Sequence, residues 1–528
     1  MQISKQAFDI IVIGSGIGGL TVASLMSQMK HKRVLVLERH YRLGGFTHSF
    51  TRSGKRTWDV GLHYVGEMAP GTMGGQLSDL ITQGGVQWNK MPSPFEKFVY
   101  PDFTFDVPDN EKEYEQALIE RFPYEQAAIR QYFKDVQAVA NWYKTDTVMQ
   151  SAPALVRWPP QLASLGAKKL ALSTTGTYLD QHFRDKQLKA VLASQWTDYG
   201  LPPAESAFAI HAVIVSHYFQ GGYYPSGGAK RIAESVVPLV EAGGGQCLIN
   251  HTVTEIIVQD GKALGVKTAI KKGKQYTEKE FFAPIIVSDA GAYTTFKRLL
   301  PESVSLPFRN QLERIASGGY GFLTVYLGMR ENPIRLGFHG ENHWIYSGYD
   351  HDAMCRQRNA VLEGTPPYCF LSFPSLKDPQ AITHTAEIIA AFDYAAVEAW
   401  KDRPWRRRGD DYQALKDRIA ENLLNFVEQR YPGFKDLVDF REVSTPLTVD
   451  TFTGHLRGAI YGMPATPERF QVPWLKVITP IKNLYLTGTD VAALGIYGAL
   501  MGGVVTAAHL MGSLGMIQIL SASKKAHA

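Results

Sequence analysis

The chain has 528 residues, of which 45% are hydrophobic and 20% charged, and its formal net charge is +5. This length and apolar content are those of a globular protein of roughly two to four domains. The basic residues are interspersed with acids, which argues against nucleic-acid binding, and the cysteines Cys247, Cys355 and Cys369 lack the close spacing of a zinc site or a disulfide framework.

The first predicted elements form a βαβ unit. "FDIIVIG" (8–14) is a short apolar strand, and "IGGLTVASLMSQM" (17–29) has the apolar spacing of a helix. "RVLVLE" (33–38) is a second strand, which ends at Glu38. Strand, helix and strand in this order predict a nucleotide-binding unit.

The glycines between the first strand and the helix support this prediction. Gly14, Gly16 and Gly19 follow the spacing G-x-G-x-x-G. In such a unit the first glycine makes the tight turn, the second lets the backbone approach a pyrophosphate and the third lets the helix lie close to the strand. We predict that Glu38 accepts hydrogen bonds from the adenosine ribose hydroxyls. The pattern alone does not distinguish FAD from NAD.

A second glycine pair follows in "ERHYRLGGFTHSF" (38–50), where Gly44 and Gly45 come shortly after the acid. Two adjacent glycines permit a second close approach of the backbone to a ligand. A nicotinamide dehydrogenase would not require this pair. It favours a long, extended cofactor that continues to contact the chain beyond its adenosine half.

In the middle of the chain, residues 223–266 predict a turn, a helix and two strands joined by Asp260-Gly261, a strong hairpin signal. The stretches 70–205 and 300–470 separate the predicted cofactor-binding blocks. We therefore expect discontinuous domains rather than consecutive ones.

Near the end, "KNLYLTGTD" (482–490) predicts a strand ending at Gly488 and Asp490, followed by a helix from near Tyr497. Residues 491–520 carry no formal charge and are long enough to cross a membrane. Their six glycines also suit a fully buried packing helix, and we expect burial.

These blocks give the chain a recognisable pattern. It resembles the FAD-dependent phytoene desaturase, carotenoid isomerase and retinol saturase group, which is related in fold to the amine oxidases. The resemblance rests on "VIGSGIGGL", "LERHYRLGGFTHSF", "WDVGLHYVG", "GGYYPSGGAKRIAESVVPLVEAGGG" and "NLYLTGTDVAALGIYGALMGG". It implies an α/β (α+β) fold with a Rossmann-type FAD-binding domain and a discontinuous substrate-binding domain of mixed sheet and helices. The expected ranges are 1–70, 205–300 and 471–520 for the first domain, and 71–204 and 301–470 for the second.

The resemblance also implies FAD as the cofactor, with no metal. Val253 is expected to meet the adenine, Asp490 the ribityl or pyrophosphate region, and the start of the last long helix the flavin pyrimidine edge. The full set of expected FAD contacts is Gly14, Gly16, Gly18, Gly19, Glu38, Arg39, Gly44, Gly45, Phe46, Gly61, His63, Val253, Gly488, Asp490, Gly498 and Ala499.

The sequence contains no G-x-S-x-G nucleophile motif and no H-E-x-x-H metal motif. The reaction chemistry is therefore expected to belong to the cofactor. His63 and Tyr64 are candidate catalytic acids or bases near the flavin; the alternative, that they only shape the flavin pocket, stays open. By resemblance, His455, Arg457 and Tyr461 belong to a segment that passes near the flavin.

Two segments are candidates for contact with a membrane or with solvent. In residues 153–172, apolar side chains such as Leu155 and Trp158 alternate with cations, which suits either a membrane interface or a surface helix. Residues 400–412 are expected to form a solvated loop. We expect a cytoplasmic protein in peripheral contact with a membrane.

The resulting hypothesis is an FAD-dependent oxidoreductase that acts on C=C or C–C bonds of a long apolar lipid as a desaturase, saturase or isomerase. The lipid is a carotenoid, a retinoid or an unsaturated fatty acyl chain. One alternative is an amine or amino-acid oxidase, although Phe46 follows the second glycine pair where amine oxidases usually carry arginine. Another is an FAD-stabilised lipid-binding or escort protein.

Overall fold

A five-stranded parallel sheet forms the base of the molecule. The computed structural model describes residues 8–149, 165–273 and 275–526, and every pair of neighbouring strands in this sheet is parallel. Its strand order is β19 (Leu484–Leu486), β13 (Ile285–Ser288), β1 (Ile10–Ile13), β2 (Val34–Leu37) and β9 (Gln246–Leu248). The predicted strands around residues 10–13 and 34–37 are thereby confirmed as neighbours.

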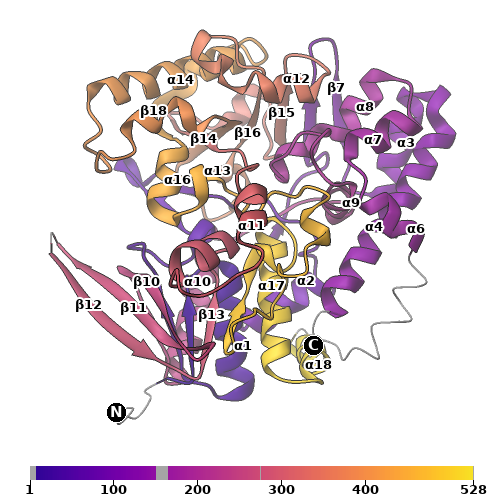
Figure 1. Cartoon of the computed structure of the whole chain (residues 1–528). Coiled ribbons are helices and arrows are strands. Elements are labelled where there is room, and N and C mark those ends of the chain that lie inside the picture. The colour runs from indigo at the N-terminus through magenta and orange to yellow at the C-terminus, as the bar shows by residue number, and fades with distance from the viewer. Residues whose placement is uncertain (1–7, 150–164, 274, 527–528) are drawn as a thin grey trace.

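Helix α1 (Ile17–Lys30) begins in the glycine turn after β1 and lies against α17 (Gly495–Leu510) and α10 (Lys230–Ala242) (Figure 1). A Cβ atom at Gly503 would lie 2.5 Å from the carbonyl oxygen of Gly18, so only glycine allows α1 and α17 to approach this closely. Residues 498–508 of α17 are all buried, as expected. Within the part of the chain that the structure describes, no helix is both long and apolar enough to cross a membrane.

A three-stranded antiparallel sheet projects beside the parallel sheet (Figure 1). It contains β10 (His251–Gln259), β11 (Lys262–Lys272) and β12 (Gln275–Phe282). Asp260 and Gly261 connect the first two strands, both with positive φ, at 50° and 71°. This confirms the predicted hairpin, because a two-residue turn with two positive φ angles matches the twist of the strands.

A seven-stranded sheet forms the opposite part of the molecule. Its neighbours are antiparallel except for β15 and β6, which are parallel. The order is β18 (Val438–Ser444), β14 (Phe322–Met329), β17 (His384–Ala391), β16 (Tyr368–Ser372), β15 (Asn342–Tyr346), β6 (Glu96–Val99) and β7 (Thr104–Val107). Two short antiparallel pairs complete the strands: β3 (Ser49–Thr51) with β4 (Thr57–Asp59), and β5 (Trp88–Lys90) with β8 (Tyr223–Pro225).

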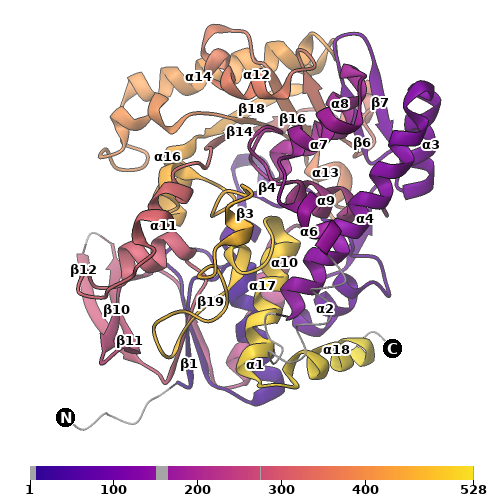
Figure 2. The same ribbon diagram turned by 45° about the vertical axis from the view of Figure 1, so that its right-hand side comes forward.

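Helices cover the seven-stranded sheet on two sides. Helix α14 (Asp410–Glu428) buries Ile419, Leu423 and Val427 in one apolar cluster with side chains of β14 and β17. The second side is a group of helices in which α4 (Gln126–Met149) packs on α9 (Phe208–His217), and Figure 2 shows this group on the right. Its other members are α3 (Glu111–Arg121), α6 (Leu165–Ala171), α7 (Thr175–His182) and α8 (Lys186–Ala193).

The remaining helices are shorter or lie at the ends of the sheets. They are α2 (Met73–Thr82), α11 (Arg309–Ala316), α12 (His351–Arg356), α13 (Pro374–Lys377), α15 (Phe434–Leu437), α16 (Pro446–Thr453) and α18 (Gly515–Ala526).

The last predicted elements differ from the structure in their boundaries. Strand β19 ends at Leu486, and residues 488–490 form a separate 3-10 turn instead of continuing the strand. Helix α17 begins at Gly495, two residues before the predicted start. Of the proposed membrane-facing segment, Leu155, Val156, Arg157, Trp158 and Leu162 lie outside the described residues. The division into two discontinuous domains stays a prediction.

Candidate functional site

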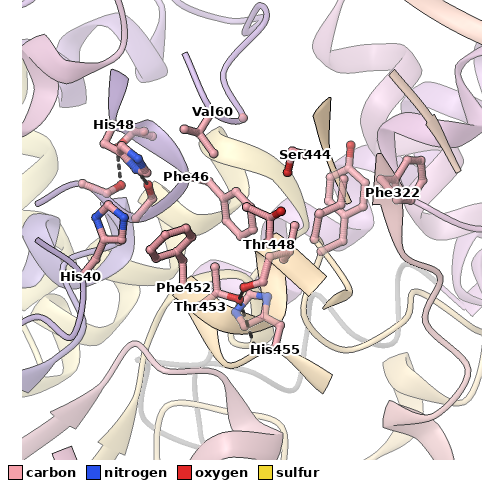
Figure 3. Close-up of a pocket in the computed structure, with 18 of the residues that line it drawn as sticks. His40, Phe46, His48, Val60, Phe322, Ser444, Thr448, Phe452, Thr453 and His455 are labelled. Carbon is pink, nitrogen blue, oxygen red and sulfur yellow. Dashed lines mark hydrogen bonds between the residues drawn. The ribbon is translucent and has the colours of Figure 1, made fainter. Parts of the chain in front are cut away.

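A cavity of about 960 Å³ extends from the carboxyl edge of the parallel sheet to the seven-stranded sheet. Residues that follow β1 and β2 line one end, and residues of β14, β16 and β17 line the other. Figure 3 shows part of its wall, where Phe452 lies beside His40. Parallel strands place their carboxyl ends at one edge, which is the usual location of a nucleotide site in an α/β sheet.

The glycine turn after β1 has no room for side chains. Gly14 has φ +96°, and a Cβ at Gly16 would lie 2.4 Å from the Asp289 carboxyl oxygen Oδ2. The second glycine pair meets this turn, because a Cβ at Gly45 would lie 3.0 Å from the Cα of Gly16. The two turns predicted from sequence therefore form one cradle at the start of α1.

Glu38 lies at the end of β2 with 6% of its surface exposed. Its carboxylate accepts a hydrogen bond from the backbone N–H of His40 at 2.7 Å, and it also binds Ser15 in the glycine turn. Glu38 thus stands at the edge of the cavity where a ribose would be bound, and it also fixes the shape of the turn.

Asp289, the residue after β13, is a site residue that sequence reasoning missed. Its carboxyl lies beside Gly16, Gly18 and Gly488. Burial raises the pKa of Asp289 to about 8, and the hydrogen bonds from the N–H groups of Gly19 and Gly16 oppose this shift. At neutral pH the acid is therefore largely uncharged, which avoids repulsion where an anionic pyrophosphate would lie. The signal was available: Asp289 ends a β-branched apolar run, "PIIVSD".

Two buried histidines flank the second glycine pair. Burial lowers the pKa of both His40 and His48 to about 4, so both are neutral at pH 7. Nδ1 of His48 lies 2.5 Å from the carbonyl oxygen of Gly45. The rings of His40 and Phe452 meet edge to face, with centroids 4.7 Å apart. These rings give the middle of the cavity an uncharged aromatic wall (Figure 3).

Most of the predicted cofactor residues lie together on the cavity wall. They are Gly14, Gly16, Gly18, Glu38, Arg39, Gly44, Gly45, Phe46, Gly61, His63, Val253, Gly498 and Ala499. Gly19, Gly488 and Asp490 do not line it. The Asp490 carboxylate instead accepts hydrogen bonds from the N–H groups of Met463 and Ala292, at 2.9 and 2.6 Å.

The two predicted catalytic residues lie on the cavity wall but differ in their partners. Nδ1 of His63 pairs with the fully buried Glu387 at 2.7 Å, and its carbonyl oxygen accepts a hydrogen bond from the Lys377 ammonium, also at 2.7 Å. Burial lowers the pKa of Lys377 to about 7. The Tyr64 hydroxyl contacts two acids, Glu96 and Asp198. No sequence signal identified these four partners, because they come from distant segments.

The segment with His455, Arg457 and Tyr461 is expected by resemblance to pass near the flavin. His455 and Tyr461 line the cavity, and Arg457 does not. The solvated loop expected at residues 400–412 is exposed at 401–404, 406, 407 and 409–411, whereas Arg408 is buried and α14 begins at Asp410. Residues 405–410 and Tyr412 line the cavity, and Arg408 is 5% exposed. The Arg408 guanidinium donates to the Thr451 hydroxyl at 2.9 Å, which ties the segment to α16.

The described residues fit FAD. One continuous cavity joins the glycine cradle, Val253 on β10, and Gly498 and Ala499 at the start of α17. The start of α1 suits a pyrophosphate, because helix N-termini favour anions. The start of α17 would stabilise negative charge on a reduced isoalloxazine in the same way. An elongated adenine–flavin molecule would contact all of these segments at once.

Comparison with known proteins agrees with this geometry. The family model "Flavin containing amine oxidoreductase" matches residues 17–511. The rat protein all-trans-retinol 13,14-reductase is 32% identical over 550 residues, which covers 97% of this chain and 88% of the relative. Prolycopene isomerase 1 of an Oncidium hybrid is 26% identical, covering 97% of this chain and 85% of the relative.

The solved structure of cyclohexylamine oxidase from Brevibacterium oxydans has a TM-score of 0.57 and 16% identity, covering 98% of this chain and 99% of that one. At this identity the match concerns the fold alone. It confirms the predicted fold class, an α/β FAD-binding fold that mixes helices and sheets.

Proposed function

The chain belongs to the flavin-containing amine oxidoreductase family and is an FAD-dependent oxidoreductase, and from this premise we propose that it acts on carbon–carbon double bonds of an apolar carotenoid or retinoid lipid. The observation that carries this proposal is the 32% identity, across 97% of the chain, to a protein named all-trans-retinol 13,14-reductase. The prolycopene isomerase similarity points to the same class of polyene.

The wall of the cavity supports an apolar substrate. Away from the glycine cradle, one part of the wall is built from aliphatic and aromatic side chains: Val213, Ile214, Phe322, Trp344, Phe370, Ile389 and Ile460. Such a surface binds a polyene by burial of apolar area and by contacts with aromatic faces. FAD supplies two-electron hydride chemistry when bound, and the chain supplies orientation, exclusion of water and proton transfer.

The experiment uses the purified holoprotein. Its flavin is reduced anaerobically and mixed with all-trans-retinol or with a carotenoid, while flavin and polyene absorbance are followed together. We expect flavin reoxidation coupled to loss of polyene absorbance, or isomerisation of the polyene without net oxidation. Peroxide release from a panel of primary amines, with no change in any polyene, would overturn the proposal in favour of an amine oxidase. Stable polyene binding without any change would favour an escort role.

We also propose peripheral contact with a membrane on its cytoplasmic side, because a polyene lipid partitions into bilayers. Two exposed apolar residues support this: Leu514, 59% exposed, precedes α18, and Ile517 within it is 65% exposed. Lys524 and Lys525 lie in the last turn of the same helix. Apolar side chains beside lysines suit an interface with anionic lipids.

Sedimentation with anionic vesicles tests this contact. The double variant Leu514→Asp and Ile517→Asp is expected to weaken vesicle binding. Ile382→Asp serves as the matched control, since Ile382 is 77% exposed but lies in the loop between α13 and β17. Equal binding by both variants would contradict the proposed role of α18.

A further inference from the structure

A tyrosine between two acids lies on the cavity wall. The Tyr64 hydroxyl oxygen is 2.5 Å from Oε1 of Glu96 and 2.5 Å from Oδ2 of Asp198. Tyr64 follows β4, Glu96 begins β6, and Asp198 ends a 3-10 turn after α8. Three distant segments therefore bring three titratable groups within hydrogen-bonding distance.

The number of hydrogen atoms available for these two hydrogen bonds shows how many of the two acids are ionised. A phenol hydroxyl has one hydrogen and can donate it to only one of the two acids. The second short contact is a hydrogen bond only if that acid brings a hydrogen of its own. Two ionised carboxylates at this distance from one hydroxyl would also repel each other in a buried place. One of the two acids is therefore protonated.

Other contacts show which acid holds the proton. Glu96 is fully buried, and its carboxylate accepts hydrogen bonds from Nε1 of Trp344 at 2.8 Å and from Nε2 of Gln195 at 2.7 Å. Donors of this kind stabilise the ionised form of an acid. The Asp198 carboxyl has the Tyr64 hydroxyl as its hydrogen-bond partner and no other among the described residues. Tyr64 accordingly donates to Glu96, and Asp198 donates to Tyr64.

Neighbouring groups favour a protonated Asp198 and an ionised Glu96. Burial raises the pKa of Asp198 well above its ordinary value, and the charge of Glu96 raises it further. Burial also raises the pKa of Glu96 to about 7, against the hydrogen bonds it accepts. The ring of Tyr218 stacks on Tyr64 with centroids 4.4 Å apart. The attraction of the Lys377 ammonium lowers the pKa of Glu96, which favours charge on Glu96.

Asp198 differs from Glu96 in its access to substrate. Asp198 and Tyr64 line the cavity, whereas Glu96 lies behind them. The adjacent wall is aromatic, with Tyr218, Trp344, Phe370 and Tyr461. A neutral carboxylic acid is thus presented to an apolar compartment, while its charged partner is withdrawn from it.

We propose that Asp198 is the catalytic acid and base that exchanges a proton with a carbon of the polyene, with Tyr64 and Glu96 as positioning residues. This inference rests on the proposed function. In saturation, the π electron pair forms a C–H bond with the Asp198 proton, the neighbouring carbon receives a hydride, and Asp198 is left as a carboxylate. In desaturation, the carboxylate takes that proton and the remaining electron pair becomes the π bond as hydride leaves. FAD, when bound, would supply or accept this hydride as a two-electron carrier.

The first test needs no substrate. Infrared difference spectra of the holoprotein in H₂O and D₂O at neutral pH are compared between wild type and Asp198→Asn. Asp289, whose pKa is about 8, contributes one carboxylic-acid carbonyl band to both proteins. We expect a second such band in wild type that shifts in D₂O and is lost in Asp198→Asn. Asp180→Asn is the matched control, because its side chain is 71% exposed and pairs with Lys189 at the surface. Identical carboxylic-acid bands in wild type and Asp198→Asn would overturn the inference.

The second test uses the reaction. Asp198→Asn is expected to slow single-turnover conversion of the polyene at least about 100-fold, the size of a general acid's contribution, with flavin content and reduction by dithionite unchanged. Asp180→Asn is expected to turn over at the wild-type rate. Turnover by Asp198→Asn at the wild-type rate would contradict the role of Asp198 but not the proposed function. If wild type converts no polyene, the proposed function fails, and the infrared band still reports whether Asp198 holds the proton.

Discussion

Ser15 and Glu38 are joined by two hydrogen bonds to the same oxygen. The backbone N–H and the hydroxyl of Ser15 both donate to Oε2 of Glu38, at 2.9 and 2.7 Å. The Ser15 hydroxyl oxygen in turn accepts the N–H of Gly44 at 3.1 Å. One acid at the end of β2 thus holds both glycine turns in place, in addition to its predicted contact with the ribose.

We therefore expect Glu38→Ala to lose FAD. The substitution leaves the buried N–H of Ser15 unpaired at a cost of about 1–3 kcal/mol, and it also removes the proposed ribose partner. The ratio of flavin to protein absorbance after purification measures the loss. Glu302→Ala, on an exposed loop, is the control. A normal flavin content in Glu38→Ala would count against Glu38 as an anchor of the cofactor.

The packing of Gly18 against Gly488 predicts a second cofactor-deficient variant. A Cβ at Gly18 would lie 2.6 Å from the Cα of Gly488, so Gly18→Ala must push α1 away from the turn after β19. Overpacking of this kind costs about 1–3 kcal/mol, so we expect a lower unfolding temperature and a flavin content reduced by about tenfold. Gly348→Ala, with open space around its Cβ position, should behave as wild type. Equal flavin content in both variants would contradict the packing argument.

Asp289 predicts a pH dependence of cofactor binding. Its pKa of about 8 lies above the ordinary value of 3.8. The folded protein therefore holds this proton where the unfolded chain has lost it, and the contribution of Asp289 to stability falls as the pH rises from 3.8 to about 8. Above that pH the ionised carboxylate also repels a pyrophosphate.

We expect the FAD dissociation constant of wild type to increase as the pH rises from about 7 to about 9, and that of Asp289→Asn to change less. Fluorescence titration of apoprotein with FAD at a series of pH values measures both. Parallel pH curves for the two proteins would exclude Asp289 as the titrating group.

Lys377 predicts a stability effect separate from flavin binding. Its ammonium donates to Oδ1 of Asn342 at 3.0 Å and to the Ser372 hydroxyl at 2.6 Å, and it is attracted to the buried carboxylate of Glu387. Lys377→Met leaves this negative charge less compensated, so we expect a loss of about 3–5 kcal/mol. Denaturant unfolding measures it, with the exposed Lys168→Met as control. A loss no larger than that of Lys168→Met would show that Lys377 does not hold this network together.

Much of the cofactor end was predictable because its signals are local. The strand, glycine turn and helix of residues 10–30 follow from apolar periodicity and from backbone angles that glycine permits, and the Asp260-Gly261 hairpin follows from the same reasoning. The segment of residues 400–412 is mostly exposed, as expected for a solvated loop, but Arg408 within it is buried. Its charged composition does not reveal that Trp405 and Arg408 line a cavity, because the covering surface belongs to α16 and β18.

The sequence by itself determined the βαβ unit, the glycine spacing and the acid that ends the second strand, since these depend on neighbours within about thirty residues. The tertiary structure alone decided that Tyr64, Glu96 and Asp198 meet, because their contact depends on pairing between strands far apart in the chain, including the parallel pair of β6 and β15. Burial of the two acids and the repulsion between their charges determine which of them is protonated. The type of residue alone does not, so the sequence could not predict this.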